Sequence, residues 1–409
     1  MASRKMFSVV ATAVCLIASP LFAQDTWKLV TADFQSRPVG IVAMDANGVH
    51  IATESNDSPS VLSWDNLLEL DHPSAANAAG PANKGDFVLY INGGDTLNGD
   101  PIAITDDSVA WKHSVLGRID IPEDRVGAIV RSGQSAAGID QPRKADVVRM
   151  LNGDTTSGVI ESVTDSSISI HPTDADASAQ ISLDKVAAIL LADPDPHASP
   201  TGRAWRVWLN DGSSLTVPAA KIVEADPTNL AVGFTDQKMF AISLANVSSI
   251  EQTNGPVRWL SAISPTETIY HPYFDENFPP QFDHPVDDPT ASIRSKFPAF
   301  RHGIGVHSYT RLAYAVPDGF TAFRTQFAVE PIATSEMTKA DLHVRIFADG
   351  KIVAEVPHVR FGPAAPPMMV DLTGKKEIAL EVDFGDNLNA QGRFVWLDSA
   401  FTKTSPSDK

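Results

Sequence analysis

The segment VRMLNGDTTSGVI, residues 148–160, begins with a largely apolar run and then enters an Asn-Gly-Asp turn. Such a turn supplies the positive φ angles that a tight β-hairpin needs. Comparable segments stand about 60 residues away on either side, VLYINGGDTLNG at 88–99 and RVWLNDG at 206–212. A hairpin that recurs at a near-constant spacing predicts an array of similar β units.

The far end of each unit is repeated as well. The matching segments are IDIPEDRVGAI at 119–129, ISLDKVAAI at 181–189, ISLANVSSI at 242–250 and the more divergent VLSWDNLLEL at 61–70. Between the two ends lie alternating stretches such as SISI at 167–170, which place one face of a strand in a core and the other in water. We therefore predict four β units, with the boundaries 24–72, 86–131, 146–192 and 204–252.

Each predicted unit is a four- or five-stranded meander whose order of turns and strands resembles small SH3-like or Sm-like barrels, in pattern only. A unit of under about 50 residues buries little surface on its own. Neighbouring units are therefore expected to pack together or to share strands, as repeat proteins do. The sequence leaves open which of the two occurs. Scaffolding is the function expected of this array.

The N-terminus has the layout of a secretory signal peptide, predicted at 1–23. Arg4 and Lys5 precede the apolar run at 7–17, and Pro20 and a small residue at Ala23 follow it. This order is typical of a cleaved signal, and the run is about half as long as a bilayer span needs. We expect an exported protein, periplasmic or extracellular, with no membrane span after signal removal.

Composition narrows the classes of function. The chain holds 32 Lys and Arg against 50 Asp and Glu, a net charge of −18, so a phosphate backbone would be repelled and no nucleic-acid partner is expected. The only cysteine, Cys15, lies in the predicted signal, which excludes a cysteine nucleophile and a cysteine-rich metal site in the mature chain. No Gly-x-Ser-x-Gly, His-Glu-x-x-His or phosphate-loop motif occurs, so no enzyme is expected.

From Pro256 onward the sequence pattern changes and different motifs appear. The informative segments are WLS at 259–261, PTE at 265–267, GIGVHS at 303–308, FADGK at 347–351, VDLTGKKE at 370–377, and Trp396 with Asp398. Their order resembles the NPCBM family, a carbohydrate-binding module also described beside glycoside hydrolase family 98 catalytic domains, here in an exported protein of planctomycete type. The resemblance covers about 256–402. It implies a galactose-binding-like jelly-roll β-sandwich, which makes the whole chain all-β.

Sugar binding needs an aromatic face for the apolar side of a ring and planar polar groups for its hydroxyls. The carbohydrate-binding candidates are Arg301, His307, Tyr309, Arg311 and Trp396. Two of them have structural alternatives: Trp396 lies in an apolar strand typical of a core, and His307 can be a buried imidazole with a backbone partner. The family usually has a His-Ala-Asp-Trp-like stretch before the last strand, where this chain reads GRFVW at 392–396.

No cofactor is expected, except that the resemblance allows a structural calcium ion. Sandwiches of the galactose-binding type often hold one, and Asp383, Asp386 and Asn387 offer oxygen ligands. The segment 385–387 also makes an ordinary turn.

The favoured function is a non-catalytic protein that binds carbohydrate or a cell-envelope glycan through its C-terminal domain. The alternatives are a structural or protein-interaction protein of the envelope, with cell-envelope proteins as partners, and an accessory protein of a glycoside hydrolase, or a hydrolase.

Overall fold

The computed structural model describes residues 26–45, 47–53, 56–72, 84–105, 107–136, 138–139, 141–192, 203–223, 226–235, 238–272, 277–289, 291–332, 339–388 and 390–403. The predicted signal peptide lies outside these residues. The described elements are β-strands and short 3-10 turns, so the chain is all-β. Within the described part of the chain, no helix has both the length and the apolar composition needed to cross a membrane.

The first half forms four meanders, each closed by a 3-10 turn and a short last strand. Unit 1 holds β1 (Thr26–Thr31), β2 (Ser36–Asp45), β3 (Gly48–Thr53), β4 (Asn56–Ser63), η2 (Trp64–Asn66) and β5 (Leu67–Asp71). Unit 2 holds β6 (Phe87–Ile91), β7 (Asp95–Ile104), β8 (Ser108–His113), β9 (Gly117–Pro122), η4 (Glu123–Arg125) and β10 (Val126–Arg131).

Units 3 and 4 follow the same plan, with one extra strand in unit 4. Unit 3 holds β11 (Asp146–Met150), β12 (Thr155–Val163), β13 (Ser167–Pro172), β14 (Ala179–Ser182), η5 (Leu183–Lys185) and β15 (Val186–Leu190). Unit 4 holds β16 (Ala204–Leu209), β17 (Ser214–Val217), β18 (Ala219–Val223), β19 (Asp226–Thr235), β20 (Lys238–Ser243), η6 (Leu244–Asn246) and β21 (Val247–Thr253).

Two of the long second strands, β7 and β12, pass very close to a neighbouring strand at a glycine. In β7, Gly99 has a φ of 152°, and a Cβ there would lie 2.2 Å from the carbonyl oxygen of Lys112. In β12, a Cβ on Gly158 would lie 2.1 Å from the carbonyl oxygen of His171. Only a residue without a side chain fits such an approach.

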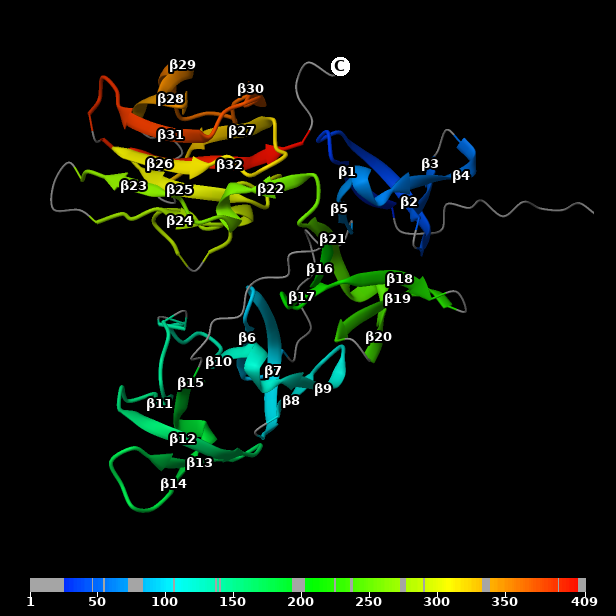
Figure 1. Ribbon diagram of the computed structural model, residues 1–409, viewed down its shortest axis with the longest axis vertical. Coiled ribbons are helices and arrows are strands. Elements are labelled where there is room, and N and C mark those ends of the chain that lie inside the picture. Colours follow the sequence, from blue (N-terminus) through cyan, green and yellow to red (C-terminus); the bar gives the residue numbers. More distant parts are fainter. Residues whose placement is uncertain are drawn as a thin grey trace, which may run out of the picture.

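The units share sheets in pairs through their closing strands. β10 pairs with β15 and joins units 2 and 3 in a 10-stranded sheet, while β5 pairs with β21 and joins units 1 and 4 in an 8-stranded sheet. In Figure 1 the green unit 4 accordingly lies beside the blue unit 1, although they are the last and first units of the array. The question that the sequence left open is answered: these units share sheets.

Units 2 and 4 touch through the turn between β16 and β17. Asp211 in this turn lies 3.1 Å from the imidazole of His113 on β8, with both side chains fully buried. The hydroxyl of Ser213 accepts a hydrogen bond of 2.9 Å from the backbone N–H of Asn98 on β7. The two shared sheets are therefore linked by a buried polar contact.

The C-terminal part is a β-sandwich. Its elements are β22 (Val257–Trp259), η7 (Leu260–Ala262), β23 (Glu267–Tyr270), β24 (Gln281–Phe282), η8 (Ile293–Ser295), β25 (Gly303–His307), β26 (Thr310–Ala315), β27 (Ala322–Val329), β28 (Asp341–Ala348), β29 (Lys351–Arg360), β30 (Met368–Asp371), β31 (Glu377–Phe384) and β32 (Arg393–Thr402). One sheet has the order β24-β25-β32-β27-β30, with β22 also on β32, and the other has the order β23-β26-β31-β28-β29.

The run Phe394–Leu397 on β32 is apolar throughout because both of its faces are covered. Phe394 and Trp396 point into the core between the two sheets, and Val395 and Leu397 pack beneath the segment around η8. Figure 1 shows this sandwich above units 2 and 3 and beside unit 1.

Candidate functional site

The outer face of the five-stranded sheet carries a row of alternating charges. On β26, β28 and β31 every second residue enters the core, so the intervening residues face outward. Arg311, Glu381 and Arg345 are neighbours across these three strands, with Glu381 opposite both arginines. One carboxylate thus stands between two guanidinium groups.

The contacts within this row differ in strength. Arg345 donates from Nε to Glu381 at 2.6 Å and also pairs with Asp383, whereas Arg311 lies 3.8 Å from Glu381. Arg311 therefore keeps hydrogen-bonding capacity on a side chain that is 24% exposed. The guanidinium of Arg311 also lies 4.6 Å from the ring centre of Phe347, an arrangement that a cation and an aromatic face favour.

Tyr309 extends this row toward one end of the sandwich. Its hydroxyl donates a hydrogen bond of 2.8 Å to Glu381, and its ring stacks on the exposed His271 with centroids 5.7 Å apart. Burial, with the hydrogen bond to Glu381 second, raises the pKa of Tyr309 to about 12, so the phenol remains a donor at neutral pH. We call Tyr309, Arg311, Arg345, Phe347 and Glu381 the outer-face cluster.

His307 lies beside this cluster but is buried. Its Nδ1 contacts the carbonyl of Ser308 at 2.9 Å, and its ring stacks on Phe278 at 5.0 Å. Ser308 donates from its backbone N–H to Gly392, which brings the turn before the last strand next to the His307 segment.

Two of the candidates lie elsewhere. Trp396 is 1% exposed in the core between the sheets, since the alternation of β32 turns it inward, and it presents no ring to a ligand. Arg301 precedes β25 at the opposite end from His307 and faces the N-terminal units. The structure thus gathers Tyr309, Arg311 and the neighbouring His307, and separates Arg301 and Trp396 from them.

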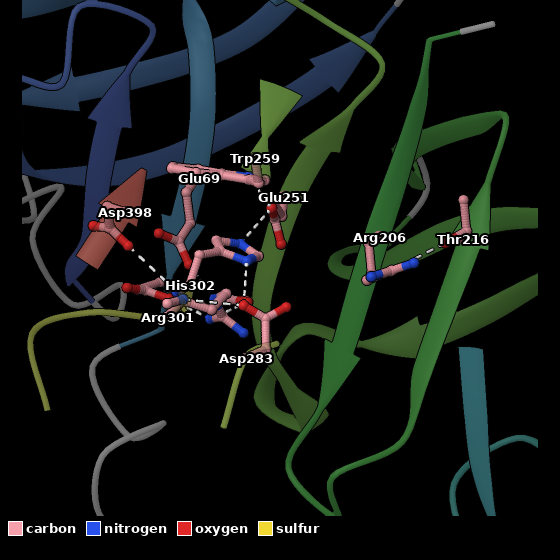
Figure 2. A network of polar contacts seen from close by, with 12 residues as sticks. Glu69, Arg206, Thr216, Glu251, Trp259, Asp283, Arg301, His302 and Asp398 are labelled. Atoms are coloured by element: carbon pink, nitrogen blue, oxygen red, sulfur yellow. Dashed lines mark hydrogen bonds and ion pairs between the residues drawn. The ribbon is translucent and has the colours of Figure 1, made fainter. Parts of the chain in front are cut away.

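Arg301 belongs to a network of buried charges that joins unit 1 and unit 4 to the sandwich, drawn in Figure 2. Arg301 contacts Glu69 at 2.6 Å and Asp71 at 2.9 Å, both on β5. His302 contacts Glu251 on β21 at 2.8 Å and Asp283 at 3.4 Å. We call this network the joint, because its acids on β5 and β21 meet bases of the sandwich.

Glu69 and Glu251 face each other across the strand pair of the joint, and their carboxyl groups titrate very differently. Burial raises the pKa of Glu69 to about 7 against the attraction of Arg301, with repulsion from Asp71 and Glu251 adding to it. Burial also opposes ionisation of Glu251, but His302 and Arg301 outweigh it and hold its pKa at about 2. At Glu69, burial and the neighbouring carboxylates therefore oppose ionisation, while Arg301 favours it.

His302 is held as a cation in the joint. Burial disfavours its charged form, yet Glu251 and Asp283 outweigh burial and raise the pKa of His302 well above its usual range. The ring also stacks on Trp259 with centroids 4.3 Å apart, and the indole of Trp259 donates to Glu251 at 2.7 Å.

The predicted calcium ligands are not gathered into one set. Asp383 pairs with Arg345, and Asn387 donates to the carbonyl of Lys339 at 2.8 Å. Asp386 instead lies near Asp341 and His358, where ligand atoms fall within 4.8 Å of one another. Asp341 is also bound by Arg360 at 2.8 Å, a cation of the chain's own.

Sequence reasoning missed several residues of these sites, namely Glu381, Arg345, Phe347, His271, Glu69 and Glu251. Alternation in 342–347 (LHVRIF) places Arg345 and Phe347 on one face and could have found that pair. The acids on β5 and β21 have no local signal, because their partners Arg301 and His302 belong to another domain and follow them by 232 and 51 residues.

Comparison with known proteins agrees with the placement of the sandwich. Residues 257–402 match the family model of the NPCBM/NEW2 domain. The NPCBM domain thus spans β22 to β32 and contains the outer-face cluster and the basic half of the joint. No curated protein matches the chain.

Several solved structures resemble the chain. One holds CBM51-2 in complex with GlcNAc and INT domains of Clostridium perfringens ZmpB, with 20% identity, 42% of this chain, 36% of that chain and a TM-score of 0.30. Another is CBM51 of Clostridium perfringens GH95 in complex with methyl-galactose, with 18% identity, 36% of this chain, 99% of that chain and a TM-score of 0.29. A third structure holds the tandem CBM51 modules of Sp3GH98 from Streptococcus pneumoniae. It has 12% identity and a TM-score of 0.30, and the match covers 92% of this chain and 88% of that chain. The chain spans about a third of the first of these structures.

Proposed function

We propose that this is an exported, non-catalytic protein that binds carbohydrate or a cell-envelope glycan through its NPCBM domain, with the N-terminal units as scaffold. The observation that carries the proposal is the match of residues 257–402 to the NPCBM/NEW2 domain. The family is a carbohydrate-binding module, and the outer-face cluster offers chemistry that suits this role.

The outer-face cluster supports the proposal in two ways. Tyr309, His271 and Phe347 present aromatic rings at a partly exposed surface, where the apolar face of a sugar can pack. Arg311 can donate to hydroxyl groups, and its position is fixed by Glu381 and by the ring of Phe347. We place the glycan contact on this cluster, next to the His307 segment.

The experiment is a glycan array probed with the mature full-length chain, followed by titration of the glycans that bind. Arg311→Ala should weaken binding by about 1–3 kcal/mol, the cost of losing one charged hydrogen bond. Tyr309→Phe keeps the ring and removes only the hydroxyl, so it should cost less. Arg118→Ala, on an exposed ion pair of unit 2, is the matched control. No bound glycan on the array, with an envelope protein recovered by pull-down, would replace the proposal by the protein-interaction alternative.

Export is a separate part of the proposal, supported by the basic, apolar and small-residue layout of 1–23. N-terminal sequencing of the protein from its natural host should begin at or near Gln24. An intact Met1 in a membrane fraction would contradict it.

A further inference from the structure

A cavity of about 220 Å³ lies where the NPCBM domain meets units 2 and 4, next to the joint. Its walls come from three parts of the chain that are far apart in sequence. Unit 2 contributes Asp95 and Arg125, unit 4 contributes Arg206 and the end of β21, and the NPCBM domain contributes Trp259 and His302, among others. Figure 2 labels Glu251, Arg206 and Thr216, which line this cavity.

The charges around this cavity are close to balanced. The acids are Asp95, Glu251 and Asp283, and the bases are Arg125, Arg206, Arg258 and His302. A strongly charged ligand of either sign would meet like charges on part of the wall. Balanced donors and acceptors suit a neutral ligand that can both donate and accept hydrogen bonds.

The protein leaves part of this hydrogen-bonding capacity unused. Glu251 is 2% exposed, and its Oε1 accepts from His302 and Trp259 while its Oε2 has no partner among the described residues. The hydroxyl of Thr253, two residues further along β21 on the same wall, also lacks a partner there. Buried polar atoms without a partner are costly, and both residues that carry them line the cavity.

The volume of the cavity and the residues of its wall further restrict the class of ligand that can bind. A volume of about 220 Å³ lies below the roughly 300 Å³ at which drug-sized pockets begin, and equals several water molecules of about 30 Å³ each. Val257, Ile263 and Trp259 add apolar wall, which suits the C–H face of a small ring. We propose that this cavity binds one small, neutral, polyhydroxylated molecule of the size of a single sugar ring.

This site is distinct from the outer-face cluster, and it goes beyond the proposed function. It exists only where the units and the NPCBM domain are docked, because no single part supplies its walls. Occupancy would therefore strengthen the docking itself, since a ligand that binds only the assembled form stabilises that form.

The test uses the mature full-length chain with two probes, methyl-galactose and N-acetylglucosamine, titrated by ligand-observed NMR. Ala262→Trp blocks the cavity mouth, because Ala262 lines the cavity and is exposed at the end of η7. Ala245→Trp is the matched control, an exposed alanine in the equivalent turn η6, which does not line this cavity. Thr253→Val, which removes the unpaired hydroxyl and keeps the shape, is the second variant.

At least one probe should bind saturably at about millimolar concentration. Ala262→Trp should weaken it tenfold or more, Thr253→Val about fivefold, and Ala245→Trp not at all. Binding unchanged in both cavity variants, or no saturable binding of either probe, would overturn the site. If the two probes bind equally well to the parent and to both cavity variants, while array glycans lose binding to Arg311→Ala, the carbohydrate function stands and only this cavity is removed.

Discussion

Arg301 is a residue for which the sequence and the structure indicate different roles. In the sequence it stands six residues before His307 and looks like part of one binding segment. In the structure its guanidinium faces Glu69, Asp71 and the hydroxyl of Ser249 on the closing strands of two other units. The sequence does not show which way an arginine side chain points, and its partners depend on which part of the chain packs against it.

Replacing Arg301 by alanine should be strongly destabilising. It would leave the paired acids of β5 buried without their main cation, and breaking a buried ion pair in this way costs about 3–5 kcal/mol. Urea denaturation measures the loss. Arg118→Ala, whose pair with Asp120 is exposed, should cost under about 1 kcal/mol. Equal losses in the two variants would mean that the joint is not a buried network in solution.

Glu69 should make stability fall as the pH rises. Its pKa is about 7 in the folded protein, against a usual value of 4.5, so the folded state keeps a proton that the unfolded state has lost. The favourable contribution is complete below about pH 4.5 and disappears as the pH rises through 7, a change of the order of 3 kcal/mol.

The variant Glu69→Gln isolates this effect, because glutamine does not titrate. Urea midpoints of the parent and of Glu69→Gln should be compared at pH 5 and pH 7. The parent should lose more stability over this interval than the variant does. His302, whose pKa is also raised, adds a further loss in both proteins above about pH 6.5. Parallel pH profiles would show that Glu69 is ionised throughout.

At the level of elements, the recurring turns are alike in sequence and unlike in role. The turn of unit 3 is solvent-exposed, and the carboxylate of Asp154 there accepts a hydrogen bond of 2.7 Å from the side chain of Asn152. The corresponding turn of unit 4 is buried against β7 and β8, where Asp211 meets His113. The repeat pattern predicted both hairpins, but pairing between hairpins is set by packing that alternation does not record.

Asp211→Ala should therefore cost about 1–3 kcal/mol, since it removes a buried carboxylate that contacts His113 and accepts from the backbone N–H of Ser213. Asp154→Ala is the matched change in the equivalent turn and should cost under about 1 kcal/mol. Thermal unfolding of both variants measures the difference. Similar costs would place the unit 4 turn at the surface, free of unit 2.

At the level of the whole molecule, the sequence predicted the β content, the repeats and the NPCBM resemblance, because hairpin turns, alternation and motif order are local. It did not predict that unit 1 shares a sheet with unit 4, nor that the NPCBM domain docks on their shared strands. The acids Glu69 and Glu251 lie in ordinary closing strands, and nothing near them in sequence marks a partner.

The joint predicts that the cost of one substitution depends on the rest of the chain. Arg301→Ala should destabilise the full-length protein, but in a fragment of residues 256–402 it should change stability by under about 1 kcal/mol, because the acids of β5 and β21 are missing. Circular dichroism should first establish that the fragment folds around its own core. An equally large loss in the folded fragment would mean that Arg301 acts within the NPCBM domain.

The pairing of β5 with β21 also has a kinetic consequence. Residues 67–71 can complete their sheet only when residues 247–253 have been made, so the contact closes a loop of roughly 180 residues. Contacts of such long separation form slowly, and until then the edge of β5 is open to other chains. Unit 1 is synthesised first, but it should be among the last units to gain amide protection during refolding. Refolding at high protein concentration should favour aggregation through the open edge of β5.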